Sequence, residues 1–109
     1  MEIEVQKIPE SLKRKGLPKK LAEICRKNDV TFMAVFGSYA RGEQRRESDI
    51  DIAIKFDPSK RKTLLDLIGL EDELRKAFRR KVDLGTFSSI SPYIIESVKK
   101  EMCVIYGKE

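Results

Sequence analysis

The sequence comprises 109 residues, which predicts one compact domain with a single modest core. Charged residues make up 38% of it, but 23 Lys and Arg nearly balance 18 Asp and Glu, so the composition is not that of a disordered chain. The absence of histidine excludes Cys/His zinc sites and His-dependent triads, so any catalysis must use carboxylates, hydroxyls, cations and metal.

The sequence also indicates the cellular location of the protein and the kind of partner that it could bind. No apolar stretch approaches the roughly 18 residues that cross a bilayer, and MEIEVQKIPE has neither the basic nor the apolar region of a secretory signal. Cys25 and Cys103 lie in apolar contexts, which favours thiols over a disulfide. We therefore expect a cytoplasmic protein. The net charge of +5 fits a polyanionic partner and, equally, a surface rich in ion pairs.

The chain is expected to begin with an N-terminal arm, residues 1–17, followed by a single domain, residues 18–109. Within the arm, EIEVQKI alternates like a short strand. Pro18 suits the first turn of a helix that ends near Asn28-Asp29. The apolar run Val30–Phe36 is typical of a central strand covered on both faces.

A short helical turn is predicted to follow Gly37-Ser38 and to end at Gly42 in a left-handed conformation. A polar loop then leads to a second strand, Asp49–Phe56. Its strict alternation places isoleucines on one face and acids on the other.

The second half of the chain continues the alternation of helices and strands. Residues 63–80 are predicted to form the longest helix, 81–87 a third strand, and 102–106 a fourth. Ser91 is expected to cap a helix that begins at Pro92 and runs to about residue 101. The long helix has an apolar stripe, expected to face the core: Leu64, Leu67, Ile68, Leu74, Ala77 and Phe78. The element order predicts an α/β sandwich with helices packed on a small sheet.

The chemistry is expected in VFGSYARGEQRRESDIDIAI, residues 35–54. A buried strand that turns at Gly37-Ser38 into a helix exposes backbone N–H groups, which can bind phosphate. Ten residues later, Asp49 and Asp51 point to the same face of a strand, roughly 7 Å apart. Such a pair can share divalent cations with phosphate oxygens, as Mg²⁺ prefers.

Each feature alone has a simpler explanation. A Gly-Ser pair is usually a turn, alternating aspartates usually form a solvated sheet face, and Asp83 alone on a strand is ordinarily a surface residue. Arg45 and Arg46 could attract a triphosphate, but a solvated loop explains them better. The combination, in this order and at this spacing, favours a phosphate and metal site.

The pattern Gly-Ser, ten residues, Asp-x-Asp resembles the signature of the polymerase β-like nucleotidyltransferase superfamily. The fuller text GSYARGEQRRESDIDIAI is similar to its minimal nucleotidyltransferases, the MNT proteins. Family members carry a third acid on the next core strand, matched here by Val82-Asp83-Leu84. The resemblance covers residues 18–107 and implies the α+β fold of this superfamily, a small mixed sheet of about four strands with packed helices.

The resemblance also implies roles for particular residues. Gly37 and Ser38 would hold the nucleotide phosphates, and Arg41 would contact the triphosphate or brace the loop. Asp49, Asp51 and Asp83 would bind two Mg²⁺ ions, with Asp83 also acting as general base. ATP is the expected substrate, although no residue identifies adenine.

The MNT branch implies a partner, a HEPN-type RNase toxin, which the antitoxin would inactivate by transferring AMP to a tyrosine. Larger relatives carry a helical acceptor domain, so part of the site is expected from a partner or from a second copy in a homodimer. Three alternatives stay open: a non-catalytic antitoxin, a nucleotide- or RNA-binding module, and transfer to a small molecule. Low aromatic content, 7%, argues against the RNA-binding module.

Overall fold

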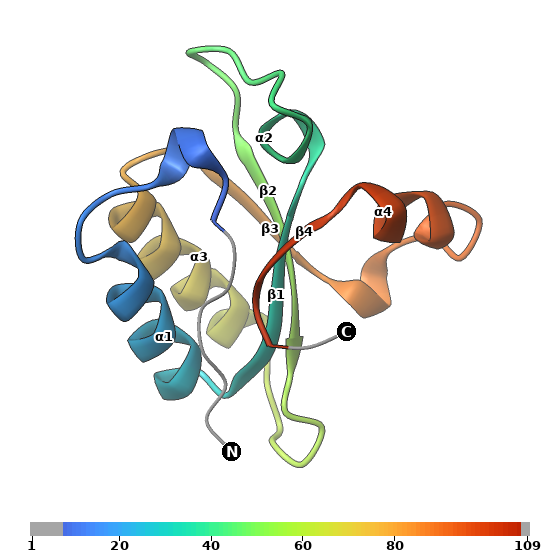
Figure 1. Cartoon of the computed structure of the whole chain (residues 1–109). Helices are drawn as coiled ribbons and strands as arrows, with labels where there is room; N and C mark the ends of the chain where they lie inside the picture. The colour runs from blue at the N-terminus through green and yellow to red at the C-terminus, as the bar shows by residue number, and fades with distance from the viewer. Residues whose placement is uncertain (1–7, 108–109) are drawn as a thin grey trace.

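The computed structural model describes residues 8–107 and consists of one four-stranded sheet with helices on both faces (Figure 1). The strand order is β3-β2-β1-β4, with β1 antiparallel to both β2 and β4, and β2 parallel to β3. The mixed sheet confirms the predicted fold class. The strands are β1 (Val30–Phe36), β2 (Ile50–Phe56), β3 (Val82–Thr86) and β4 (Cys103–Tyr106).

Two longer helices cover one face of the sheet, as Figure 1 shows. They are α1 (Leu17–Lys27) and α3 (Leu64–Phe78). The isoleucines of β2 point toward them and form the main core with their apolar faces. Residues 8–16 contribute to the same core through Ile8 and Leu12, the latter in the 3₁₀ helix η1 (Glu10–Leu12). The division of the chain at residue 17 stays a prediction, and the strand predicted within the arm falls mainly outside the described residues.

The opposite face carries a smaller apolar cluster under shorter elements. Phe32, Ala34 and Ala53 pack there against Phe87. This last residue begins the 3₁₀ helix η2 (Phe87–Ser89), which leads to α4 (Ile95–Glu101). The sparse cover leaves room for the acids, which share this face of β2.

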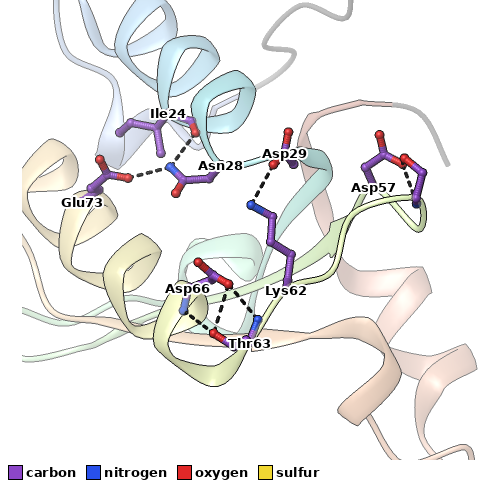
Figure 2. Close-up of polar contacts among 9 residues, drawn as sticks. Ile24, Asn28, Asp29, Asp57, Lys62, Thr63, Asp66 and Glu73 are labelled. Carbon is purple, nitrogen blue, oxygen red and sulfur yellow. Dashed lines mark hydrogen bonds and ion pairs between the residues drawn. The ribbon is translucent and has the colours of Figure 1, made fainter.

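A capping box fixes the start of α3. The Thr63 hydroxyl accepts a hydrogen bond from the Asp66 backbone N–H, while the Asp66 carboxylate accepts from the Thr63 N–H at 2.8 Å (Figure 2). Asn28, at the end of α1, donates to a Glu73 carboxylate oxygen at 2.6 Å and to the Ile24 carbonyl at 2.8 Å. These contacts tie α1 to α3 in one layer.

Two helix predictions need correction. Leu64 and Ile68 were expected in the core, but they are 70% and 56% exposed, and Leu70 is buried instead. Leu67, which lies between them, is half-buried against the main core, so the stripe is only partly covered in the first turns of α3. The last helix begins at Ile95 rather than at Pro92, because the Ser91 hydroxyl accepts from the Tyr93 N–H within a turn that precedes it.

Other sequence expectations hold. Pro18 lies in the first turn of α1, and Gly42 has φ of 73° in the left-handed region. Neither Cys25 nor Cys103 is in a disulfide. No helix among residues 8–107 combines the length and apolar character needed to cross a membrane.

Candidate active site

Three carboxylates lie near one another where the parallel strands begin. Asp49 directly precedes β2, Asp51 is its second residue, and Asp83 is the second residue of β3. The parallel register pairs Asp51 with Asp83. Since neighbouring strands lie about 4.8 Å apart, paired residues place their side chains side by side on one face. The structure therefore brings together all three acids that the sequence singles out.

The acids interact electrostatically. Burial raises the pKa of Asp51 above its ordinary value, and the negative charges of Asp83 and Asp49 raise it further. The nearby Arg41 guanidinium opposes this by favouring the charged form. Asp51 is half-buried, while Asp49 and Asp83 are exposed. The site thus concentrates negative charge that a bound cation would neutralise.

Gly37 is required by the position of Asp51. The residue has φ of 64°, in the left-handed region. A Cβ built on it would collide with the Asp51 carboxylate oxygen Oδ2 and lie 3.4 Å from its Cγ. The β1–β2 register explains this contact, because Phe36, the neighbour of Gly37, pairs with Asp51. Because Gly37 has no side chain, the turn can lie directly against the Asp51 carboxylate.

Gly37 also opens α2 (Gly37–Arg41), which joins the turn to the rest of the site. Ser38 is half-buried in its first turn, and its carbonyl accepts from the Glu43 N–H at 2.8 Å. Arg41 forms ion pairs with Glu43 at 3.2 Å and with Glu101 of α4 at 3.6 Å. These pairs link Arg41 to the following loop and to α4, and the nucleotide contact expected of Arg41 stays a prediction.

The carboxylates fit a magnesium site that also uses substrate oxygens. Within residues 8–107, no three His, Cys, Asp or Glu side chains converge so closely that protein ligands alone would hold an ion. Mg²⁺ is ordinarily bound by one or two carboxylates together with phosphate oxygens and water. An all-oxygen donor set with mutual repulsion at Asp51 matches that pattern.

A largely apolar cavity of about 480 Å³ adjoins the acids. Asp51 and Asp83 form part of its wall, with Phe36 and Gly85 from the sheet and Ile94 from the turn before α4. Ile94 is 52% exposed and its neighbour Tyr93 is 96% exposed. The sequence did not indicate this cavity, because its far wall is built by the turn that had been predicted as the start of a helix.

Comparison with known proteins identifies the family. Residues 18–105 match the nucleotidyltransferase domain family. A Methanocaldococcus jannaschii protein, provisionally named a protein adenylyltransferase, is 39% identical over 85 residues, which is 78% of this chain and 89% of that protein. The protein adenylyltransferase MntA of Thermococcus cleftensis is 38% identical over 78 residues, covering 70% of this chain and 75% of MntA.

Solved structures agree on the fold. A toxin–antitoxin complex with AMP-PNP contains a chain that superposes with a TM-score of 0.68 at 28% identity, over 84% of this chain and 73% of that one. An MNT antitoxin complex from Shewanella oneidensis, bound to a tri-AMPylated HEPN toxin, matches at a TM-score of 0.59 and 24% identity, over 83% and 69%. The likeness to this second complex shows the fold alone. The chain is therefore a nucleotidyltransferase and belongs to the nucleotidyltransferase domain family, in its minimal, MNT branch.

Proposed function

We propose that this chain transfers AMP from ATP to a hydroxyl group of a partner protein, a tyrosine of a HEPN-type RNase toxin, and thereby acts as an antitoxin. The observation that carries the proposal is the position of Asp51, which has Asp83 and Asp49 as charged neighbours and lies against the side-chain-free turn at Gly37. Relatives named protein adenylyltransferases and a toxin–antitoxin complex holding an ATP analogue support it.

Each part of the site has a task in this reaction. The turn at Gly37 and Ser38 holds the β- and γ-phosphates, since exposed N–H groups and a hydroxyl are phosphate donors. Asp49, Asp51 and Asp83 hold Mg²⁺, which when bound neutralises the phosphates and favours ionisation of the acceptor hydroxyl. The apolar cavity next to Asp51 and Asp83 has room for the nucleoside.

The transfer itself is a displacement at phosphorus. The acceptor oxygen forms a bond to the α-phosphorus of ATP, the bond from that phosphorus to the bridging oxygen breaks, and pyrophosphate leaves. The acceptor proton passes to Asp83, the acid on the edge strand. Such reactions need positioning and charge neutralisation more than a protein nucleophile, so a chain without histidine can carry them out.

Intact-mass spectrometry of candidate partners tests the proposal. Small proteins encoded beside this gene are incubated with the chain, ATP and Mg²⁺, and the expected product is one neighbour heavier by at least one adenylyl unit, with the adduct on a tyrosine. An Asp49→Asn/Asp51→Asn variant should give no adduct. If this variant neutralised the partner as fully as the wild type, with no adduct from either, the chain would be a non-catalytic antitoxin instead.

A further inference from the structure

The three tyrosines of the chain differ sharply in exposure. Tyr39 and Tyr106 are 3% and 4% exposed, whereas Tyr93 is 96% exposed. Tyr93 is the most exposed of the large apolar side chains in residues 8–107, and its hydroxyl forms no hydrogen bond with any residue in that range. Tyr93 is therefore the tyrosine whose hydroxyl another molecule can reach while this chain stays folded.

Tyr93 lies on a turn that borders the active-site cavity. Its neighbours Ser91 and Ile94 line that cavity, whose wall also includes Asp51 and Asp83. The Ser91 hydroxyl accepts from the Tyr93 N–H at 3.3 Å and the Ser91 carbonyl accepts from the Ile94 N–H at 3.1 Å, so the turn has a defined shape. In Figure 1 this segment, between η2 and α4, lies at the outer edge of the molecule. The turn thus presents an exposed aromatic ring next to an apolar cavity.

The turn and the cavity together form a self-complementary surface. Two-fold pairing brings the same surface of two copies together, so the projecting Tyr93 and Ile94 of each copy can cover the mouth of the other copy's cavity. Residues 84–95 include no charged side chain, so this segment can approach the acids without repulsion. Asp83 is exposed, so a hydroxyl can reach it from outside. Within one chain, by contrast, Tyr93 does not line the cavity.

We propose that Tyr93 is itself an acceptor, adenylylated in the active site of a second copy of this chain. The inference rests on the proposed function, because it uses the same transfer with a different tyrosine. The Tyr93 oxygen forms a bond to the α-phosphorus of ATP, the bond from that phosphorus to the bridging oxygen breaks, and pyrophosphate leaves. The phenol proton passes to Asp83 of the copy that holds the ATP. Two copies therefore serve each other as enzyme and acceptor.

Intact-mass spectrometry of the chain alone, incubated with ATP and Mg²⁺, tests whether it modifies itself. The expected product is heavier by one adenylyl unit, and peptide mapping should place the adduct on Tyr93. Tyr39 and Tyr106 are internal controls, because both are buried and should stay unmodified. Tyr93→Phe removes only the exposed hydroxyl, so this variant should fold, remain unmodified and still label a partner protein as fully as the wild type.

A mixing experiment tests the role of the second copy. Tyr93→Phe keeps the site but lacks the acceptor, whereas Asp49→Asn/Asp51→Asn keeps the acceptor but lacks the site, so neither should be modified alone. In the mixture, the adduct should form on Tyr93 of the Asp49→Asn/Asp51→Asn chain, at a rate that rises with the concentration of Tyr93→Phe. Adding Tyr93→Phe to the inactive chain as well should abolish this product.

The outcomes separate the inference from the proposed function. An unmodified mixture, when the wild type alone is modified, would mean transfer within one chain and would overturn the inference. So would an adduct on another residue, loss of partner labelling by Tyr93→Phe, or no self-adduct from a wild type that labels a partner protein. The absence of transfer to any protein, this chain included, would overturn the proposed function.

Discussion

The carboxylate of Asp51 occupies the space in which a side chain on residue 37 would lie, so Gly37 and Asp51 form one structural unit. The antiparallel register of β1 and β2 creates this contact by pairing Phe36 with Asp51. The turn that is proposed to bind phosphate is thereby fixed next to a carboxylate that is proposed to bind metal. A change at either residue is expected to disturb both functions.

Gly37→Ala should reduce both stability and transfer. The substitution forces an alanine into φ of 64° and a Cβ onto the Asp51 carboxylate, so we expect a loss of about 1–2 kcal/mol in the free energy of unfolding. Urea denaturation gives this value, and label transfer from ATP gives the activity. Gly42→Ala is the matched control, because Gly42 has a similar φ but nothing within 4 Å of its Cβ. Equal activity losses in both variants would contradict the proposed coupling.

Asp51→Asn should strongly reduce transfer without unfolding the protein. The charge of Asp51 is disfavoured by burial and by its acidic neighbours, so the neutral amide should leave the unfolding free energy equal or slightly higher. Transfer should fall on the order of a thousandfold, as when a transition-state contact is lost. Glu23→Gln, on the exposed surface of α1, serves as a control for removal of one carboxylate. If Asp51→Asn unfolded enough of the protein to explain the lost transfer, the result would argue against a direct role of Asp51 in the reaction.

The ion pair between Arg41 and Glu101 predicts a particular thermodynamic coupling. Arg41→Gln and Glu101→Gln should each cost less than about 1 kcal/mol, because both partners are exposed. The double variant should cost less than the sum of the single ones, as chemical denaturation of all four proteins would show. If Arg41→Gln weakened AMP-PNP binding while Glu101→Gln did not, Arg41 would be a nucleotide contact as well as a brace.

Much of the fold follows from local patterns. The alternation of Asp49–Phe56 predicts which face of β2 is buried, and the apolar run Val30–Phe36 predicts a central strand. Alternation alone places Asp49 and Asp51 on one face, but Asp83 could be added only by resemblance, since the pairing of Asp51 with Asp83 depends on contacts distant in sequence. A pocket that joins the loop before β2 to the turn before β3 escaped prediction for the same reason, because only the parallel pairing of β2 with β3 makes these segments neighbours.

The two incorrect helix predictions, the buried stripe of α3 and the start of α4, also have a physical cause. Periodicity places Leu64 and Ile68 on the same stripe as Leu74, but it does not show how far the neighbouring layer extends. Ser91 and Pro92 are typical residues for a helix start. Here the Ser91 hydroxyl is used in a preceding turn, which contributes Ile94 to the cavity wall.

Arg79→Gly should stabilise the protein. Arg79 ends α3 with φ of 57°, a conformation that costs a residue with a Cβ about 1 kcal/mol relative to glycine. The midpoint of thermal unfolding should therefore rise by a few degrees, roughly 4–8 °C for each kcal/mol in a domain of this size. Arg80→Gly, at the next position, should not raise it. A lower midpoint for Arg79→Gly would mean that the arginine side chain makes a stabilising contact.

The two thiols should differ in reactivity. Burial raises the pKa of the Cys25 thiol to about 12, so at pH 8 on the order of one in ten thousand is ionised. Because the thiolate is the reactive form, a disulfide reagent at pH 8 should modify half-buried Cys103 first and Cys25 only on unfolding. Reaction of a Cys103→Ser variant at equal rates with and without denaturant would contradict the buried position of Cys25.

Calorimetric titration of the chain with AMP-PNP, with and without Mg²⁺, tests most directly the claim that the acids and the Gly37 turn form one nucleotide site. The account predicts at least about tenfold tighter binding with Mg²⁺, an advantage that Asp49→Asn/Asp51→Asn removes and Gly37→Ala weakens. Equal affinity with and without the ion, or full binding by the double variant, would show that the three carboxylates do not hold the nucleotide.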